Sequence, residues 1–253
     1  MKNSSNNHSI SIKGLSVSYG RKRVLTNIHL EIESGNIYGV IGPNGAGKST
    51  LFKSILGLIE VNAGEIKVFN QSIEDSKLRV AYVPQKDDVD WTFPATVMDI
   101  VLMGRYPHKK LFQRINNQDK AIAVKALQDL GIEDLKDRQI GQLSGGQQQR
   151  VFIARALCQE ADIFLMDEPF VGVDMTTEEK IIEMMRKKAK EGKTLLVVHH
   201  DLASADEYFD KVILLNQRLI AYGDIETTFT RELISVTYGP QLTILHKSGL
   251  IDG

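Results

Sequence analysis

The chain is poor in cysteine and in long apolar runs, and both absences restrict what it can be. Cys158 is the only cysteine among 253 residues, so no disulfide can form within the chain. No apolar run approaches the ~18 residues of a membrane-spanning helix. Residues 1–7 form a polar amino-terminal tail without the apolar core of a signal peptide. We therefore expect a cytoplasmic protein that reaches a membrane only through a partner.

An excess of charge of one sign is also lacking. Lys and Arg total 31 and Asp and Glu total 32, which leaves a formal net charge of −1. Proteins that bind nucleic acid usually carry a basic excess, so we expect no nucleic-acid partner. Internal repeats are absent, which favours one domain over a fused pair. Cys158 lies in an apolar helical pattern and is expected to be an inert core thiol.

The hydrophobic pattern alternates between strands and helices. Residues 10–19 and 24–32 alternate apolar and polar positions, as half-exposed antiparallel strands do. Residues 37–41, 163–166 and 195–198 are short apolar runs, which are typical of buried parallel strands. Helical patterns separate these runs. We therefore predict an α/β fold with a mostly parallel core sheet and an antiparallel β-subdomain.

A helical subdomain is predicted as an insertion at about residues 90–160. Apolar residues recur there at helical spacing before a possible helix stop, at Ala121, Val124, Leu127, Leu130 and Gly131. A later helix is predicted to begin at a capping box formed by Thr176 and Glu179. The predicted domain covers residues 8–240, and residues 241–253 form a carboxy-terminal tail.

A glycine-rich loop follows the apolar run at 37–41. It consists of Gly42, Pro43, Asn44, Gly45, Ala46, Gly47, Lys48 and Ser49, followed by Thr50. This is the full G-x-x-x-x-G-K-S spacing, with a strand before it and a helix pattern after it. Such a loop turns backbone N–H groups toward a phosphate chain, and the helix adds its positive end. We expect Lys48 to reach the β- and γ-phosphates and the Ser49 hydroxyl to bind Mg²⁺.

Two acidic residues, Asp167 and Glu168, end the apolar run at 163–166. Asp167 is expected to hold Mg²⁺, and Glu168 to act on the attacking water beyond the γ-phosphate. Two acids at a strand end can also be a solvated loop, but the phosphate loop upstream favours the catalytic interpretation.

A second glycine motif lies well beyond the loop, at Leu143, Ser144, Gly145, Gly146 and Gln147. Ser144 can cap a helix that begins at Gly145 and so leave N–H groups free to bind phosphate. With these two motifs followed by an apolar strand that ends in Asp-Glu, the chain resembles the ATP-binding cassette (ABC) ATPases over about residues 8–240. The resemblance implies a P-loop NTPase of the ABC type, a Mg²⁺-dependent ATPase coupled to transmembrane transport.

The resemblance also implies roles for further residues. Gln85 matches the glutamine that touches Mg²⁺ and the attacking water, and Tyr19 matches the aromatic residue that stacks on adenine. Tyr19 packed on the sheet is the alternative. His200, directly before Asp201, matches the histidine that contacts the γ-phosphate, and His199 is expected to face the sheet or a helix.

In the resembled family the Leu143–Gln147 signature contacts the nucleotide of a second subunit. The resemblance therefore implies a homodimer in which each ATP site is completed in trans. Asp174 matches the acidic residue of the D-loop, although the sequence before it, Phe170-Val171-Gly172-Val173, departs from the commoner Ser-Ala-Leu.

The segment around Trp91 and Phe93 resembles the branch that takes up manganese, zinc or iron. Large aromatic residues are favoured anchors at interfaces, so we expect both to contact an integral-membrane permease. The alternative is that both fill the core of the helical subdomain. An importer of this type also works indirectly with an extracellular solute-binding protein, and its ATPase is peripheral on the inner face of the membrane.

Two other functions stay open on the sequence. One is an importer ATPase for siderophore, haem or another solute. The other is an ABC ATPase that acts on ribosomes or DNA, but that class usually has two cassettes or a long coiled-coil insertion. Neither feature occurs here, and the charge balance offers no basic surplus.

Overall fold

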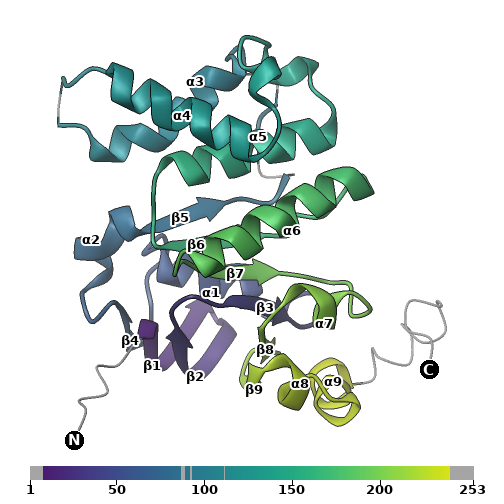
Figure 1. Ribbon diagram of the computed structural model, residues 1–253. Coiled ribbons are helices and arrows are strands. Elements are labelled where there is room, and N and C mark those ends of the chain that lie inside the picture. Colours follow the sequence, from purple (N-terminus) through teal and green to yellow (C-terminus); the bar gives the residue numbers. More distant parts are fainter. Residues whose placement is uncertain (1–7, 87–88, 92, 111, 240–253) are drawn as a thin grey trace, which may run out of the picture.

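The computed structural model describes residues 8–86, 89–91, 93–110 and 112–239. Two sheets lie below a layer of helices in the view of Figure 1. The α6 helix (Met175–Lys190) runs between that layer and the strands. Within these residues, no helix has both the length and the apolar character needed to cross a membrane.

The first sheet is antiparallel, with the strand order β2-β1-β4. Its strands are β1 (His8–Tyr19), β2 (Lys22–Glu33) and β4 (Ala63–Val68). A two-residue turn joins β1 to β2, and Gly20 there has φ of 57°, which glycine adopts without strain. This sheet is the predicted antiparallel β-subdomain.

The core sheet has the strand order β5-β6-β7-β3-β8-β9. Its strands are β3 (Ile37–Ile41), β5 (Val80–Val83), β6 (Ile163–Asp167), β7 (Thr194–Val198), β8 (Lys211–Leu215) and β9 (Leu219–Asp224). All neighbours are parallel except β8 and β9. The mostly parallel sheet is therefore confirmed. The carboxyl ends of parallel strands meet at one edge, where ligands bind in folds of this class.

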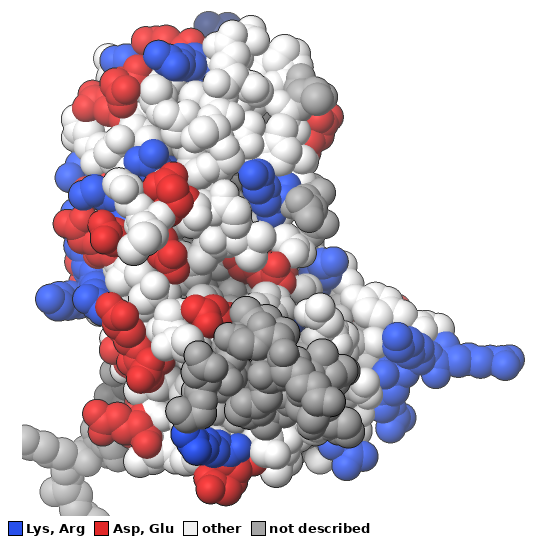
Figure 2. Space-filling view, turned by 90° about the vertical axis from the view of Figure 1, so that its right-hand side faces the viewer, with Lys and Arg blue, Asp and Glu red and all other residues white. Residues whose placement is uncertain are grey.

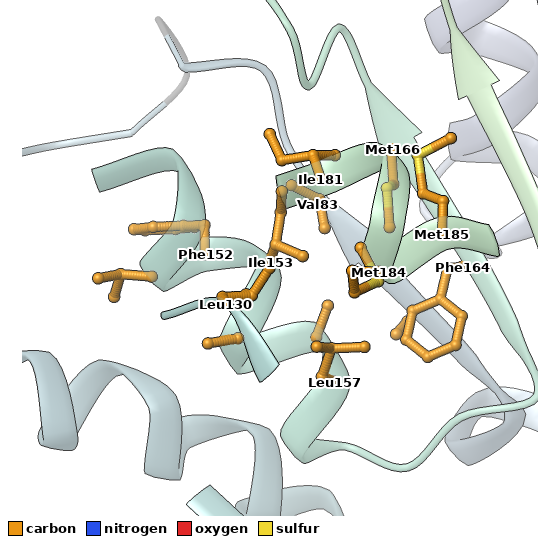
Figure 3. Packing of buried hydrophobic residues seen from close by; sticks show 14 of the residues in the cluster. Val83, Leu130, Phe152, Ile153, Leu157, Phe164, Met166, Ile181, Met184 and Met185 are labelled. Carbon is orange, nitrogen blue, oxygen red and sulfur yellow. The ribbon is translucent and has the colours of Figure 1, made fainter. Parts of the chain in front are cut away.

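Two hydrophobic cores cover the two faces of this sheet. Between the sheets lies α1 (Lys48–Ile55), with Leu51 and Phe52 fully buried. On the other face, α5 (Gly145–Cys158) packs against α6 and β5. Figure 3 shows Ile153 of α5 among Met184, Ile181 and Met166. This second core joins the helical layer to the sheet.

The inserted helical layer consists of α3 (Val97–Leu102), α4 (Asn117–Asp129) and α5. Short helices complete the fold: α2 (Ile73–Ser76), α7 (Ala205–Tyr208), α8 (Ile225–Thr228) and α9 (Arg231–Tyr238). The 3₁₀ turns are η1 (Lys77–Arg79), η3 (Met103–His108), η4 (Glu133–Leu135) and η5 (Ile140–Gln142). Buried Arg105 of η3 donates to the carbonyl of Cys158 at 2.8 Å and to Asp119 at 3.2 Å, which ties η3 to α4 and the end of α5.

Two local predictions need correction. Of the apolar residues predicted at helical spacing in α4, Leu127 and Leu130 are buried, but Ala121 is exposed, and Ala123 and Ala126 are buried in its place. The α6 helix begins at Met175, because Asp174 accepts a hydrogen bond from the Thr177 N–H at 2.9 Å and so caps it. Thr176 therefore lies within the first turn and forms no capping box.

The surface carries both signs of charge. Figure 2 shows acidic and basic side chains interspersed along the left side of one face, mostly uncharged residues at its centre, and a group of Lys and Arg side chains that projects at its right-hand edge.

Candidate functional site

The glycine loop follows the carboxyl end of β3 and packs closely against two other strands, β8 and β2. A Cβ atom on Gly42 would overlap the carbonyl oxygen of Leu215 in β8. Gly47 has φ of 96°, and a Cβ there would lie 2.6 Å from Leu25 Cδ2 of β2. Glycine is therefore required at both positions, by space at Gly42 and by space and conformation at Gly47. The loop brings the amino end of α1 and its unpaired N–H groups to the edge of the sheet.

Lys48, the first residue of α1, lies inside the loop and is only 6% exposed. Its Nζ donates to the carbonyl oxygens of Gly42 at 2.6 Å and Pro43 at 3.0 Å. Burial lowers the pKa of the ammonium to about 8, and the charges of Glu168 and Asp167 act against that shift. The loop thus holds a partly desolvated cation that an anion would stabilise.

An open cavity of about 290 Å³ lies over the loop. Its lining comprises Lys22, Arg23, Val24, Asn44, Gly45, Ala46, Gly47, Lys48, Ser49, Thr50, Glu168, His200 and Gln217. Backbone N–H groups, a helix amino end and several cations are the features that bind a phosphate chain. The predicted phosphate loop therefore lines a cavity of the expected chemistry.

Gln85 and His200, which follow β5 and β7, both contact Glu168, which follows the strand between them, β6. Gln85 Nε2 donates to Glu168 Oε2 at 2.7 Å, and His200 Nε2 lies 2.5 Å from Glu168 Oε1. Glu168 itself has φ of 54°, a strained conformation for a residue with a side chain. Both oxygens of the carboxylate are thus held in place in the cavity lining, where the carboxylate can act as a base or orient a water.

Asp167 and Ser49, both near Lys48, have side-chain oxygens of the kind that bind a hard cation such as Mg²⁺. Asp167 is 2% exposed, and the Tyr82 hydroxyl lies 3.5 Å from its Oδ2. Ser49 lines the cavity. In the part of the chain that the structure describes, no group of three His, Cys, Asp or Glu forms a metal site. Mg²⁺ needs only one or two protein ligands when phosphates and waters supply the others, so these residues fit it.

The signature motif caps α5 as predicted. Ser144 Oγ accepts from the Gln147 N–H, and Gln147 Oε1 accepts from the Ser144 N–H. A Cβ on Gly146 would lie 2.9 Å from Thr177 Oγ1, so this glycine lets α5 approach α6. Leu143 is buried beneath the cap. None of residues 143–147 lines the cavity of the same chain. The fold therefore keeps the two glycine motifs apart within one copy.

Asp174 and Tyr19 lie outside the cavity lining as well. Hydrogen bonds from Thr177, first of all from its backbone N–H, hold the pKa of Asp174 below its usual range. Tyr19 is 50% exposed at the end of β1, opposite Lys22 in the β1–β2 register. The residue is thus accessible to a ligand.

Trp91 and Phe93, which were predicted as a pair, lie in different environments. The Trp91 ring packs edge-on against Phe152 of α5 with centroids 5.0 Å apart, and its Nε1 donates to the Lys86 carbonyl at 2.9 Å. Phe93 is 54% exposed. Trp91 therefore fits, in part, the alternative that it fills the core of the helical subdomain. Phe93 does not, and it remains accessible to a partner.

The His199 ring is buried among Phe170, Tyr208 and Phe209, and its Nε2 lies 2.9 Å from Ser204 Oγ. Burial lowers its pKa to about 4, so the ring is neutral at pH 7. This agrees with the expectation that His199 faces inward while His200 faces the cavity.

Sequence reasoning missed four cavity residues: Lys22, Arg23, Val24 and Gln217. Gln217 donates its backbone N–H to the Ala46 carbonyl at 2.8 Å and accepts from the Thr26 N–H at 2.8 Å, so it joins the loop to β2. Lys22 and Arg23 line the cavity. They belong to a run of three cations, residues 21–23, between the two predicted antiparallel strands. In the sequence, only the run of cations could have indicated that this segment lines the site. Gln217 contacts the loop through its backbone, so its side chain gives no such indication.

Comparisons with known proteins agree with this geometry. A family model described as ABC transporter matches residues 25–171. The chain is 49% identical over 244 residues to the manganese transport system ATP-binding protein MntB of Bacillus subtilis (strain 168), covering 96% of this chain and 98% of that protein. It is 48% identical over 236 residues to the zinc transport system ATP-binding protein TroB of Treponema pallidum (strain Nichols), covering 93% and 89%. Among solved structures, the ADP conformation of MJ1267, an ATP-binding cassette of an ABC transporter, matches with a TM-score of 0.76 at 26% identity, covering 95% and 98%.

The buried ammonium of Lys48 predicts a pH dependence of folding. Its pKa of about 8 in the folded protein lies below the ordinary value of 10.5, so between these pH values the unfolded chain binds more protons. Stability from this group therefore rises as the pH increases through that window. We expect Lys48→Met to remove roughly 1–3 kcal/mol of this rise, measured as the difference in urea unfolding free energy across the window. If the unfolding free energies of the wild type and Lys48→Met changed with pH in the same way, the lowered pKa of a buried Lys48 ammonium would be contradicted.

Proposed function

The chain belongs to the ABC transporter family, and we propose that it is the ATP-hydrolysing subunit of an importer for manganese, zinc or iron ions. The proposal that the chain hydrolyses ATP is supported above all by the carboxylate of Glu168, which Gln85 and His200 orient in the cavity lining. A protein that only bound nucleotide would not need a carboxylate held from both sides.

The relatives' names support the cargo. Manganese is the cargo in the names of the relatives from Bacillus subtilis and Listeria monocytogenes, and zinc in that of the relative from Treponema pallidum. These proteins match over nearly their whole lengths. We therefore assign the chain to transition-metal import, with iron included on the resemblance of the Trp91–Phe93 segment.

The proposed hydrolysis assigns one task to each group. Lys48 and the N–H groups of the loop hold the phosphates, and Ser49, Asp167 and Gln85 are the ligands that would hold Mg²⁺. Bound Mg²⁺ would neutralise charge on the phosphates. Glu168 accepts a proton from the attacking water or orients it. The assignment of His200 to the γ-phosphate is supported by its contact with Glu168, and that of Tyr19 to adenine by its exposure.

A homodimer would complete the site. The motif at residues 143–147 has a capped helix end but does not line its own chain's cavity. We propose that ATP closes two copies head to tail, so that Ser144 and Gly146 of one meet the phosphates held by the other. Asp174, which caps α6 beside Gly146, would lie at the same contact. Hydrolysis then opens the dimer.

The relatives are subunits of transport systems, so a membrane permease is implied as partner. We propose that Phe93 contacts it, with Trp91 as the support that holds the segment on α5. The chain would lie peripherally on the inner face of the membrane, and an extracellular solute-binding protein would deliver the ion. Residues 8–240 would act as one ATPase domain in which the subdomain at about 90–160 transmits the motion.

Replacing Glu168 by Gln should separate binding from hydrolysis. We expect the Glu168→Gln variant to bind ATP while its turnover falls about 10²–10⁴-fold, because the amide accepts no proton. ATP should also shift this variant to dimers in size-exclusion chromatography. Glu179→Gln, on the exposed face of α6, is the control and should retain turnover. Wild-type turnover in Glu168→Gln, or full turnover by a strict monomer, would refute the mechanism.

Phe93→Ala should weaken permease binding about tenfold without changing ATP affinity, since an exposed aromatic anchor is lost. Affinity for the detergent-solubilised permease measures the effect. Leu58→Ala removes another exposed apolar side chain and serves as the matched control. If both variants bind the permease as tightly as the wild type, Phe93 is not an anchor.

The cargo can be tested by elemental analysis of cells that lack this chain. We expect lower uptake of manganese, zinc or iron, restored by the wild-type chain but not by Glu168→Gln. Unchanged metal uptake together with lost uptake of haem or a siderophore would replace the proposed cargo.

A further inference from the structure

Two cations of β2 line the nucleotide cavity and have no part in the mechanism above. Lys22 and Arg23 are the first residues of the strand, and both are exposed. With Val24 they form the wall that β2 contributes to the cavity, whose lining also includes Glu168 and His200. Nothing in the glycine-loop motif accounts for cations at this wall.

The start of β2 is held in register with the loop. The position of a Cβ on Gly47 lies 3.1 Å from the Val24 carbonyl oxygen and 2.6 Å from Leu25 Cδ2. The backbone of Gln217 bridges Ala46 of the loop and Thr26 of β2 through two hydrogen bonds of 2.8 Å. Both contacts lie within four residues of Arg23, so the cations are carried by a strand that packs directly on the phosphate loop.

The charges on this turn are not offset by acidic neighbours. Over the described ranges, no carboxylate lies within ion-pair distance of Arg21, Lys22 or Arg23. Three successive cations repel one another, and an anion bound beside them relieves that repulsion. A triphosphate carries more negative charge than Lys48 and one divalent cation neutralise. The wall and the ligand are therefore electrostatically complementary.

The strand register indicates which part of the nucleotide these cations meet. Lys22 is paired with Tyr19, and Arg23 with Ser18. Tyr19 is the residue assigned to adenine, whereas Glu168 and His200 are assigned to the γ-phosphate at the other end. The cations thus lie on the nucleoside side of the loop.

We propose that Lys22 and Arg23 bind the α-phosphate of the adenine nucleotide, an inference that rests on the proposed ATPase function. Because ATP and ADP share this phosphate, the two residues stabilise substrate and product equally. They would therefore set nucleotide affinity and retain ADP after hydrolysis, while Lys48 responds to the outer phosphates. Both contacts are charge-assisted and depend on ionic strength.

The test uses the full-length chain and measures the dissociation constants of Mg-ATP, Mg-ADP and adenosine by calorimetry. Lys22→Ala and Arg23→Ala should each weaken ATP and ADP about five- to twentyfold, and by the same factor, and should leave adenosine unchanged. Arg21→Ala is the matched control, because it removes the same charge from the same turn but Arg21 does not line the cavity. It should change each constant less than about twofold. Arg23→Lys should restore part of the affinity.

The outcomes separate this proposal from the ATPase assignment. If Lys22→Ala and Arg23→Ala weaken both nucleotides no more than Arg21→Ala does, the α-phosphate role is overturned while wild-type hydrolysis keeps the proposed function. A loss confined to ATP also overturns it, because the cations would then face the γ-phosphate. A wild-type chain that binds neither nucleotide would refute both proposals.

Discussion

The rest of the site depends on the close packing of the glycine loop against β8 and β2. Gly42 packs against the Leu215 carbonyl, and Gly47 against Leu25. With no side chains in these gaps, the loop backbone can turn inward and place the amino end of α1 over the sheet edge. The same packing carries the start of β2, with its two cations, to the cavity. A methyl group on Gly42 would overlap the backbone of β8, and one on Gly47 would strain the backbone at φ of 96° and displace the Leu25 side chain.

Electrostatics at this loop prepares it for an anion. Burial removes most of the hydration of Lys48, and the carbonyl oxygens of Gly42 and Pro43 compensate only in part, so the pKa of the ammonium falls. A phosphate would supply the missing negative charge. The carboxylate of Glu168 lines the same cavity, and Gln85 and His200 hold it there. One cavity thus combines a cation that attracts phosphate with a carboxylate that can act on the attacking water.

The position of the signature motif connects this chemistry to assembly. The cap of α5 lies against the first turn of α6, through Gly146 and Thr177, and away from its own cavity. The same helix packs through Ile153 on the sheet and through Phe152 on Trp91, which precedes the exposed Phe93. One rigid helix therefore links the motif proposed for the second subunit with the segment proposed for the permease.

Motifs with a fixed local geometry were predictable from sequence. The phosphate loop depends on glycines at set spacing, and the cap of α5 on Ser144 and Gln147, which are neighbours in the chain. The order of buried apolar runs was enough to predict a mostly parallel sheet. Features that depend on contacts between distant residues were not predictable. Ala121 is exposed although it fits the helical pattern, because contacts with α3 and α5 decide which side of α4 is buried. Trp91 was predicted to act together with Phe93, but only Trp91 packs against Phe152, which lies about 60 residues further along the chain. Lys22, Arg23 and Gln217 join the site because strand register brings β2 and β8 to the loop, and no short stretch of sequence encodes that register.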